Sequence, residues 1–174
     1  VVRLVGSEMC IRDRFSASSN LFSESGLDLD QIGIWEDLGD IEYSGEIEEE
    51  SFKKIKTFVK DILASDQKLV SLGGDHSVSW PILDAHLDAW DTLDILHIDA
   101  HPDLYDSLLD NKLSHASPFA RVMETGRVNR LVQIGIRTLN KHQREQAEKF
   151  EVEIFQMKDL SKLSSLSFSK PVYC

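Results

Sequence analysis

Residues 93 to 106 of the chain, LDILHIDAHPDLYD, join an apolar run to an acidic run that contains histidine. The first six residues have the length and the branched apolar side chains of a buried β-strand. Asp99, His101 and Asp103 follow at every second position, and alternate side chains of an extended chain share a face. The sequence therefore predicts two carboxylates and an imidazole at the carboxyl end of a strand, the usual place for active sites in open α/β sheets.

Helical and strand patterns alternate on both sides of this stretch. Apolar residues at helical spacing, with an acidic start and later lysines, predict an amphipathic helix over 47–64. The other segments with regular patterns are predicted strands at 31–35, 68–72, 130–136, 152–156 and from 170 on, a turn at 37–40, and predicted helices at 77–89, 116–125 and 139–149. This alternation indicates right-handed crossovers and an α/β fold, with helices on both faces of a parallel sheet.

Composition narrows the class of protein and its partners. The 174 residues, 41% apolar and 28% charged, suit one globular domain. A net charge of -11 disfavours nucleic acid and anionic lipid as partners and is compatible with a cationic substrate. No apolar run approaches membrane-spanning length. Cys10 and Cys174 lie near opposite ends, which predicts neither a disulfide framework nor a thiolate metal cluster and favours a cytoplasmic location.

The first fourteen residues have an unusual sequence. VGSEMCIRDR at 5–14 resembles the translated adapter sequence found at the edges of assembled reading frames. We therefore expect residues 1–14 to be a non-native leader and residues 15–174 to form part of a single domain. The alternative is a genuine polar N-terminal tail.

A second group of functional residues lies one βα unit upstream, in LGGDHSVSWP at 72–81. The glycines permit a tight turn that would bring His76 to the carboxyl edge of the sheet, beside Asp99. Histidine together with aspartate suits a divalent ion such as manganese, whereas structural zinc more often recruits thiolates. Two ligand-bearing loops with a carboxylate able to bridge predict a two-metal site that activates water.

LGGDHSVSWP and ILHIDAHPD resemble the first two signature motifs of the ureohydrolase family, which includes arginase and agmatinase. DNKLSHASPFARVME at 110–124 and LVQIGIRTLNKHQREQAEKF at 131–150 are similar to plant-type arginases and to bacterial agmatinase-like proteins. The resemblance implies the family's three-layer α/β fold with a mainly parallel central sheet, here truncated on its C-terminal side. Residues 15–174 would be the N-terminal portion of a single ureohydrolase domain.

The resemblance also implies a mechanism. His76, Asp99 and Asp103 would bind one Mn²⁺ ion, and His101 would bind a second ion together with Asp99, which bridges the two. Hydroxide between the ions would attack the guanidinium carbon, and the intermediate would collapse to urea and an amine. His115 would pass a proton to the leaving amine, a task that suits imidazole.

The resemblance further implies a small cationic guanidino substrate and a homo-oligomer, either a trimer or a hexamer. The loop from Leu104 to Ser114 would face the substrate tail and help to select it. L-Arginine is the first expectation and agmatine the alternative.

The sequence departs from the family pattern in one respect: the third motif, SxDxDxxDP, does not occur in these 174 residues. In relatives this motif follows a segment like KPVY and supplies two further aspartate ligands. We therefore expect the 174-residue polypeptide alone to be inactive or nearly so. A non-catalytic metal-binding remnant remains an alternative, as does, less well matched, a related deacetylase with one zinc ion. The coding sequence beyond Cys174 separates the enzyme from the remnant.

Several polar residues near the motifs are expected to have structural roles. His97 is interpreted as a core residue with its hydrogen bonds satisfied, and His86 and His142 as structural or solvated histidines. Asp75 is expected to cap the following helix or to support a ligand.

Overall fold

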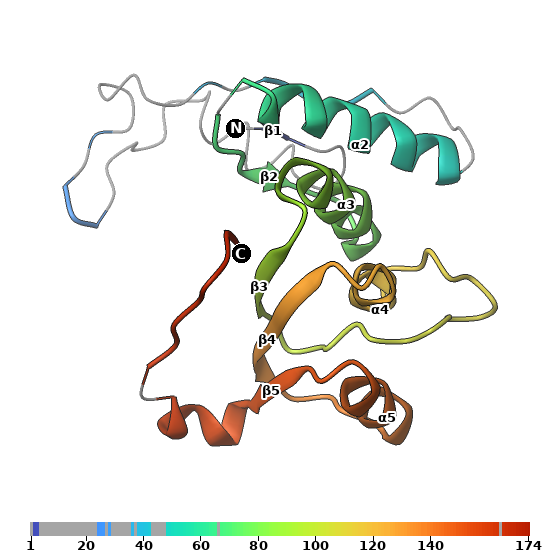
Figure 1. Ribbon diagram of the computed structural model, residues 1–174, viewed down its shortest axis with the longest axis vertical. Coiled ribbons are helices and arrows are strands. Elements are labelled where there is room, and N and C mark those ends of the chain that lie inside the picture. Colours follow the sequence, from blue (N-terminus) through green and yellow to red (C-terminus); the bar gives the residue numbers. More distant parts are fainter. Residues whose placement is uncertain are drawn as a thin grey trace.

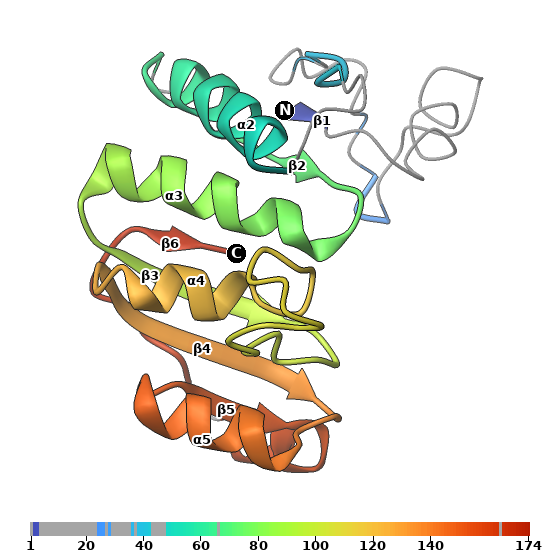
Figure 2. The ribbon, with the colours of Figure 1, turned by 90° about the vertical axis from the view of Figure 1, so that its right-hand side faces the viewer.

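The computed structural model describes residues 2–3, 24–26, 28, 36, 38–42, 48–65, 67–163 and 165–174. The predicted strand at 31–35 and most of the proposed leader lie outside these residues. Among the described residues, the main sheet has four strands, all parallel, in the order β5–β4–β3–β6 (Figures 1 and 2). Their bounds are Leu93–Ile98 for β3, Val128–Ile136 for β4, Glu153–Gln156 for β5 and Val172–Tyr173 for β6. A separate parallel pair joins β1 (Val2–Arg3) to β2 (Ser71–Leu72).

Three helices cover the same face of the main sheet (Figures 1 and 2). They are α3 (Ser79–Trp90), α4 (Pro118–Glu124) and α5 (Lys141–Lys149). Helices were expected on both faces, and among the described residues these three all lie on one. On β3, Leu93 and Ile95 are buried toward the helices, whereas Ile98 is 67% exposed.

The main core lies between this sheet face and the three helices. Its buried members come from every layer: Leu83, Leu87, Leu93, Ile95, Leu104, Phe119, Val122, Leu131 and Ala147. Burying a Leu, Ile or Phe side chain stabilises the fold by roughly 1.5–3 kcal/mol. This core therefore holds β3 and β4 in fixed register beneath the loops that follow them.

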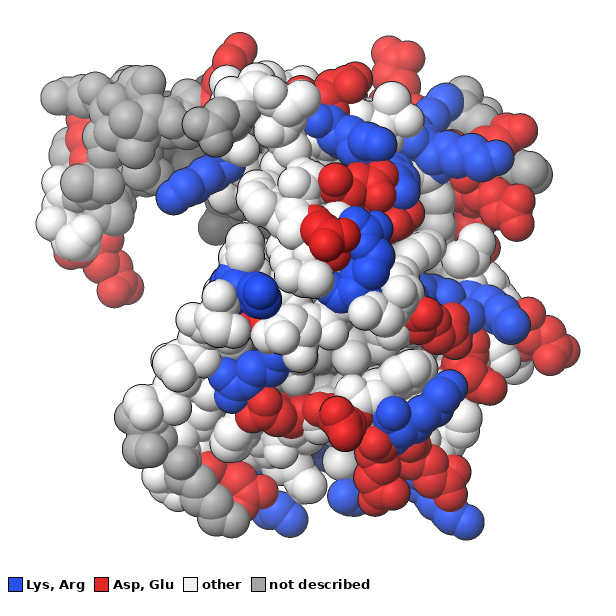
Figure 3. Space-filling model, in the orientation of Figure 1, with Lys and Arg blue, Asp and Glu red and all other residues white. Residues whose placement is uncertain are grey.

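Helix α2 (Glu48–Leu63) packs on α3 through a second apolar cluster. Its buried members are Ile55, Val59 and Ile62 on α2 and Ile82 and Ala85 on α3. Ion pairs border this contact, with the Lys56 Nζ 2.7 Å from Asp84 and the Lys60 Nζ 3.0 Å from Asp88. Hydrogen bonds from Lys60 and Lys56 lower the pKa of Asp88 to about 2. On the face drawn in Figure 3, the described acidic and basic side chains are interspersed, so no continuous basic surface forms there.

The sequence predicted most elements to within a few residues. The strand at 93–98 is confirmed, and the helix predicted over 47–64 is confirmed as α2 with one residue fewer at each end. The strand expected at 68–72 is shorter, because only Ser71 and Leu72 pair with β1. The helix expected from residue 77 begins as a 3₁₀ turn, η1 (His76–Val78). The strand expected from residue 170 is confirmed as β6.

Asp94 anchors the C-terminal segment to β3. Its side chain is fully buried and accepts hydrogen bonds from Asn129 Nδ2 at 2.6 Å and from the backbone N–H groups of Ser169 at 2.9 Å and Lys170 at 3.1 Å. Burial opposes ionisation of Asp94, yet these donors hold the pKa of its carboxyl below the usual value. The ionised carboxylate of Asp94 therefore holds Ser169 and Lys170, which lead into β6, against β3.

We expect Asp94→Asn to lower the free energy of unfolding by about 2 kcal/mol, because one oxygen that accepts buried hydrogen bonds becomes a donor. Chemical denaturation measures this loss. Asp61→Asn, on the exposed face of α2, is the control and should change stability little. Since the pKa of Asp94 is lowered in the folded state, its contribution is present above the unfolded pKa and is lost as the pH falls through the folded value. Equal stability of the two variants at pH 7 would contradict this role.

Candidate metal centre

A tight turn between β2 and η1 brings His76 to the carboxyl edge of the sheet. A Cβ atom at Gly73 would lie 2.8 Å from the Val78 Cγ2, so a larger residue there would force the turn apart. The Asp75 carboxylate caps η1 by accepting a hydrogen bond of 2.9 Å from the Ser77 backbone N–H. His76 Nδ1 lies 2.6 Å from Asp103 Oδ2, which joins the two loops directly.

Asp99, His101 and Asp103 follow β3, but the backbone between them is not simply extended. The His101 backbone N–H donates a hydrogen bond of 2.8 Å to Asp99 Oδ1, and His101 Nδ1 lies 3.4 Å from the same oxygen. Asp103 has a φ of 45°, a left-handed conformation that aspartate tolerates better than most residues. This turn directs Asp103 toward His76, so strand alternation alone does not explain how the three side chains converge.

One cavity of about 770 Å³ collects the predicted site residues. Its lining includes all four proposed ligands and the proposed proton-transfer residue: His76, Asp99, His101, Asp103 and His115. Tyr105 and Leu108, from the loop expected to face the substrate tail, line it as well. Within the described residues, His115 makes no hydrogen bond to the four proposed ligands. It is grouped with them because it lines the same cavity.

The far wall of the cavity comes from the segment between β4 and α5. Asn140 caps α5 by accepting a hydrogen bond of 2.9 Å from the Gln143 backbone N–H. The Asn140 side chain also donates a hydrogen bond to the Tyr105 hydroxyl, and the His142 ring stacks on Tyr105. These contacts hold Tyr105 at the cavity, and no local sequence pattern predicts them.

The charges of the site favour binding a cation. Burial opposes ionisation of Asp99, but the hydrogen bond from the His101 backbone N–H and the neighbouring His97 and His76 lower the pKa of its carboxyl. Burial, reinforced by His76, lowers the pKa of His97 to about 4, so this imidazole is neutral at physiological pH. The site thus presents the ionised carboxylate of Asp99 to a cation, and the neutral His97 beside it adds no opposing positive charge.

His97 lies closer to the site than the sequence analysis expected. It is buried, as predicted, but its Nε2 has no hydrogen-bond partner among the described residues and lies 3.5 Å from Asp99 Oδ2. Ligand atoms of His76, His97 and Asp99 all lie within 4.8 Å of one another. His97 is a core residue, as expected, but the expectation that its hydrogen bonds are all satisfied fails at Nε2. The strand parity that His97 shares with Asp99 was the available signal.

Gly135 also contributes to the site, although no sequence motif pointed to it. It has a φ of 90° at a register shift between β4 and β5, and a Cβ there would lie 3.3 Å from the backbone oxygen of Asp99. Glycine is suited to both the conformation and the close approach. β4 can therefore pass directly beside Asp99, where the loop that carries the proposed ligands Asp99, His101 and Asp103 begins.

We expect Gly135→Ala to lower the free energy of unfolding by about 1–3 kcal/mol through backbone strain, and to weaken metal binding by displacing Asp99. Thermal denaturation and a manganese titration of the variant measure the two effects. Gly126→Ala is the control: its φ of 66° is also left-handed, but a Cβ there would meet nothing within 4 Å. If both variants lost stability alike and neither lost manganese affinity, the close approach to Asp99 would have no importance for the site.

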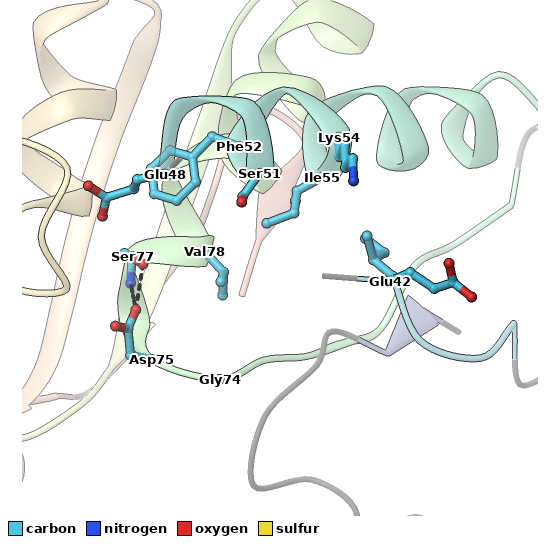
Figure 4. A pocket seen from close by; sticks show the side chains of 11 residues that line it. Glu42, Glu48, Ser51, Phe52, Lys54, Ile55, Gly74, Asp75, Ser77 and Val78 are labelled. Atoms are coloured by element: carbon cyan, nitrogen blue, oxygen red, sulfur yellow. Dashed lines mark hydrogen bonds between the residues drawn. The ribbon is translucent and has the colours of Figure 1, made fainter. Parts of the chain in front are cut away.

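A second cavity, of about 350 Å³, lies between α2 and the loop that precedes η1 (Figure 4). Phe52 and Ile55 of α2 line it, as do Asp75 and Ser77. Asp75 thus lines this second cavity rather than the one with the proposed ligands, and its hydrogen bond to the Ser77 backbone N–H supports the capping role.

The comparisons with known proteins identify the family. Residues 10–169 match the model of the arginase family, so the chain belongs to this family. A solved arginase from Medicago truncatula superposes with a TM-score of 0.83 at 35% identity, over 93% of this chain and 57% of that one. The ureohydrolase resemblance and the arginase-like α/β fold are therefore confirmed.

Individual relatives are named for different activities. An arginase from Glycine max is 44% identical over 152 residues, which are 83% of this chain and 43% of that protein. An N(1)-aminopropylagmatine ureohydrolase from Thermus thermophilus is 41% identical over 107 residues, or 62% of this chain and 36% of that protein. The chain spans about half the length of the first curated relatives it matches. None of the helices in the described residues is long and apolar enough to cross a membrane.

Proposed function

We propose that this chain provides the first two ligand motifs of a manganese-dependent ureohydrolase, one that converts L-arginine to L-ornithine and urea. The observation that carries the proposal is the convergence of His76, Asp99, His101 and Asp103 on one cavity. The 44% identity to the arginase from Glycine max supports arginine as the substrate.

The donor atoms of the cavity fit manganese. Carboxylate oxygen and imidazole nitrogen are ligands that this ion accepts, and no cysteine is among the described residues that line the cavity. His76, Asp99 and Asp103 would hold one ion, and Asp99 and His101 would hold the other. Bound there, the two ions would lower the pKa of water and so supply the nucleophile for attack on the guanidinium carbon.

The chain's own residues bind the substrate and move protons. The carboxylates of Asp99 and Asp103 and the net charge of -11 attract a guanidinium cation to the cavity. Tyr105, held by Asn140, and Leu108 would limit the space for the substrate tail. His115 would donate a proton to the amine nitrogen as the C–N bond breaks, so the products leave as urea and a protonated amine.

A second candidate is agmatinase activity, in which agmatine gives putrescine and urea. The Thermus thermophilus relative, which is named for an agmatine derivative, supports this candidate. A third candidate, from another class, is a metal-binding protein without catalysis, because SxDxDxxDP does not occur in the 174 residues.

Three expectations about the protein as a whole belong to the same proposal. Residues 1–14 would be a non-native leader, and the rest would be the N-terminal portion of one ureohydrolase domain. The complete protein would form a trimer or a hexamer. It would act in the cytoplasm, although two plant relatives are named as mitochondrial or as chloroplastic and mitochondrial.

The direct test begins with the gene. Its sequence is read past the Cys174 codon, and the whole reading frame is expressed with added Mn²⁺. Urea release is then assayed from arginine, agmatine and guanidinobutyrate. We expect an in-frame SxDxDxxDP and the highest activity on arginine, with the 174-residue polypeptide alone near background.

Each other outcome favours a different function. Preferential hydrolysis of agmatine would replace arginase by agmatinase. A stop codon directly after Cys174, together with manganese binding and no urea release, would favour the non-catalytic protein. Strong urea release by the 174-residue polypeptide would contradict the expected need for the third motif.

A further inference from the structure

The amide of Gln133 lies between His97 and the loop that carries the proposed ligands. Gln133 on β4 pairs with His97 on β3 in the sheet register, and both side chains are buried. The Gln133 Nε2 lies 2.7 Å from the backbone oxygen of Pro102 and 3.1 Å from His97 Nδ1. One amide group therefore contacts both the ligand loop and the buried imidazole.

These two contacts determine which nitrogen of His97 carries the proton. The Pro102 carbonyl can only accept a hydrogen bond, so the amide of Gln133 must present its NH₂ group to it, and a flipped amide would place two oxygens in contact. The same NH₂ group faces His97 Nδ1, which must then accept. In a neutral imidazole with Nδ1 as the acceptor, the proton is on Nε2.

The protonated Nε2 faces Asp99. It lies 3.5 Å from Asp99 Oδ2, a long separation that a small rotation of the carboxylate would shorten to a hydrogen bond. Phe119 packs against the imidazole with ring centroids 4.1 Å apart and so restricts its rotation. A nitrogen that carries a proton cannot bind a metal ion. His97 is therefore not a ligand, although its ligand atom lies within 4.8 Å of those of His76 and Asp99.

We propose that His97 is a positioning residue, which Gln133 holds in the Nε2–H form so that it donates to Asp99 and orients that carboxylate toward the cavity. This inference rests on the proposed function, because Asp99 is one of the proposed manganese ligands. Partners of this kind behind metal ligands typically change metal affinity 10- to 100-fold. Asp99 would thus be oriented from two sides, by His97 and by the His101 backbone N–H.

The tautomer is tested without metal. The metal-free 174-residue chain is labelled with ¹⁵N in its histidines, and NMR spectra of the ring nitrogens are recorded near pH 7. The His97 resonances are assigned by their loss in His97→Asn. We expect a protonated Nε2 and an unprotonated Nδ1, and we expect Gln133→Met to produce a mixture of tautomers. A protonated Nδ1 in the unaltered chain would overturn the proposal.

The positioning role is tested by manganese affinity, measured from the EPR signal of free Mn²⁺. His97→Asn keeps a polar group near Nδ1 but removes the donor toward Asp99, and we expect affinity to fall about tenfold or more. His97→Gln places an amide nitrogen near the Nε2 position and should recover most of that loss. The matched control is His86→Asn, because His86 is also a buried histidine with an Nδ1 hydrogen bond, here to the backbone oxygen of Ile82, and it does not line the cavity.

Melting temperatures of all three variants separate loss of fold from loss of binding. Unchanged affinity in His97→Asn would overturn the positioning role, and so would a loss that His97→Gln does not recover, since this indicates a direct ligand. If the unaltered chain binds no manganese, the proposed metal site fails and the positioning role fails with it. The tautomer assignment is decided separately by the NMR spectrum.

Discussion

Asp99→Asn should weaken manganese binding by the 174-residue chain at least about 100-fold, more than the 10- to 100-fold typical of residues behind a ligand. Because Asp99 is proposed to bind both ions, removing its negative charge should weaken the binding of each ion. Its carboxyl pKa lies below the usual value, so the group is ionised at neutral pH, whereas an amide is never charged. Isothermal titration calorimetry with Mn²⁺, or EPR of the unbound ion, measures the loss.

The substitution should leave the fold intact. An asparagine oxygen can still accept the hydrogen bond that the His101 backbone N–H donates to Asp99. Asp91→Asn is the matched control, because Asp91 is exposed at the end of α3 with a φ of 60°, a conformation that asparagine also adopts. We expect unchanged affinity in the control. If Asp99→Asn bound manganese as tightly as Asp91→Asn, the ligand assignment would be wrong.

His115→Asn is expected to reduce kcat for urea release by 10²- to 10⁴-fold, which is the usual contribution of a general acid or base. The measurement uses the protein expressed from the whole reading frame, with saturating Mn²⁺ and with arginine as substrate. His115 lines the cavity but makes no hydrogen bond to the proposed ligands in the described residues. The loss should therefore fall on kcat, with KM and manganese affinity changed only a few-fold.

Manganese affinity serves as the internal control for this variant. A large fall in affinity would show that His115 acts as a ligand or supports one, and unchanged kcat would remove it from the mechanism.

The elements with regular patterns and the two motif loops could be predicted from the sequence. The apolar spacing in α2 and the branched residues of β3 are local signals, and each element forms where its pattern indicates. The glycine turn before His76 is also local, because the contact of a Gly73 Cβ would be with Val78, only five residues away. The ligand candidates followed from these positions and from the family resemblance.

The contacts between elements could not be predicted in the same way. The left-handed conformation of Asp103 brings its carboxylate to His76, and this depends on how two loops 27 residues apart fold against each other. The bond between Gln133 and His97 depends on the register of β3 with β4, which no local pattern specifies. His97 therefore had the sequence signature of a core residue, while its second nitrogen faces the site.

His76, Asp99, His101 and Asp103 are proposed to bind manganese in the cavity at the carboxyl edge of the sheet. The most direct measurement is X-ray diffraction from crystals of this chain soaked in Mn²⁺, with anomalous difference maps calculated above and below the manganese absorption edge. We predict anomalous density among these four side chains, with a ligand distance to Asp99 and none to His97. Manganese density elsewhere, with none in this cavity, would contradict this ligand assignment.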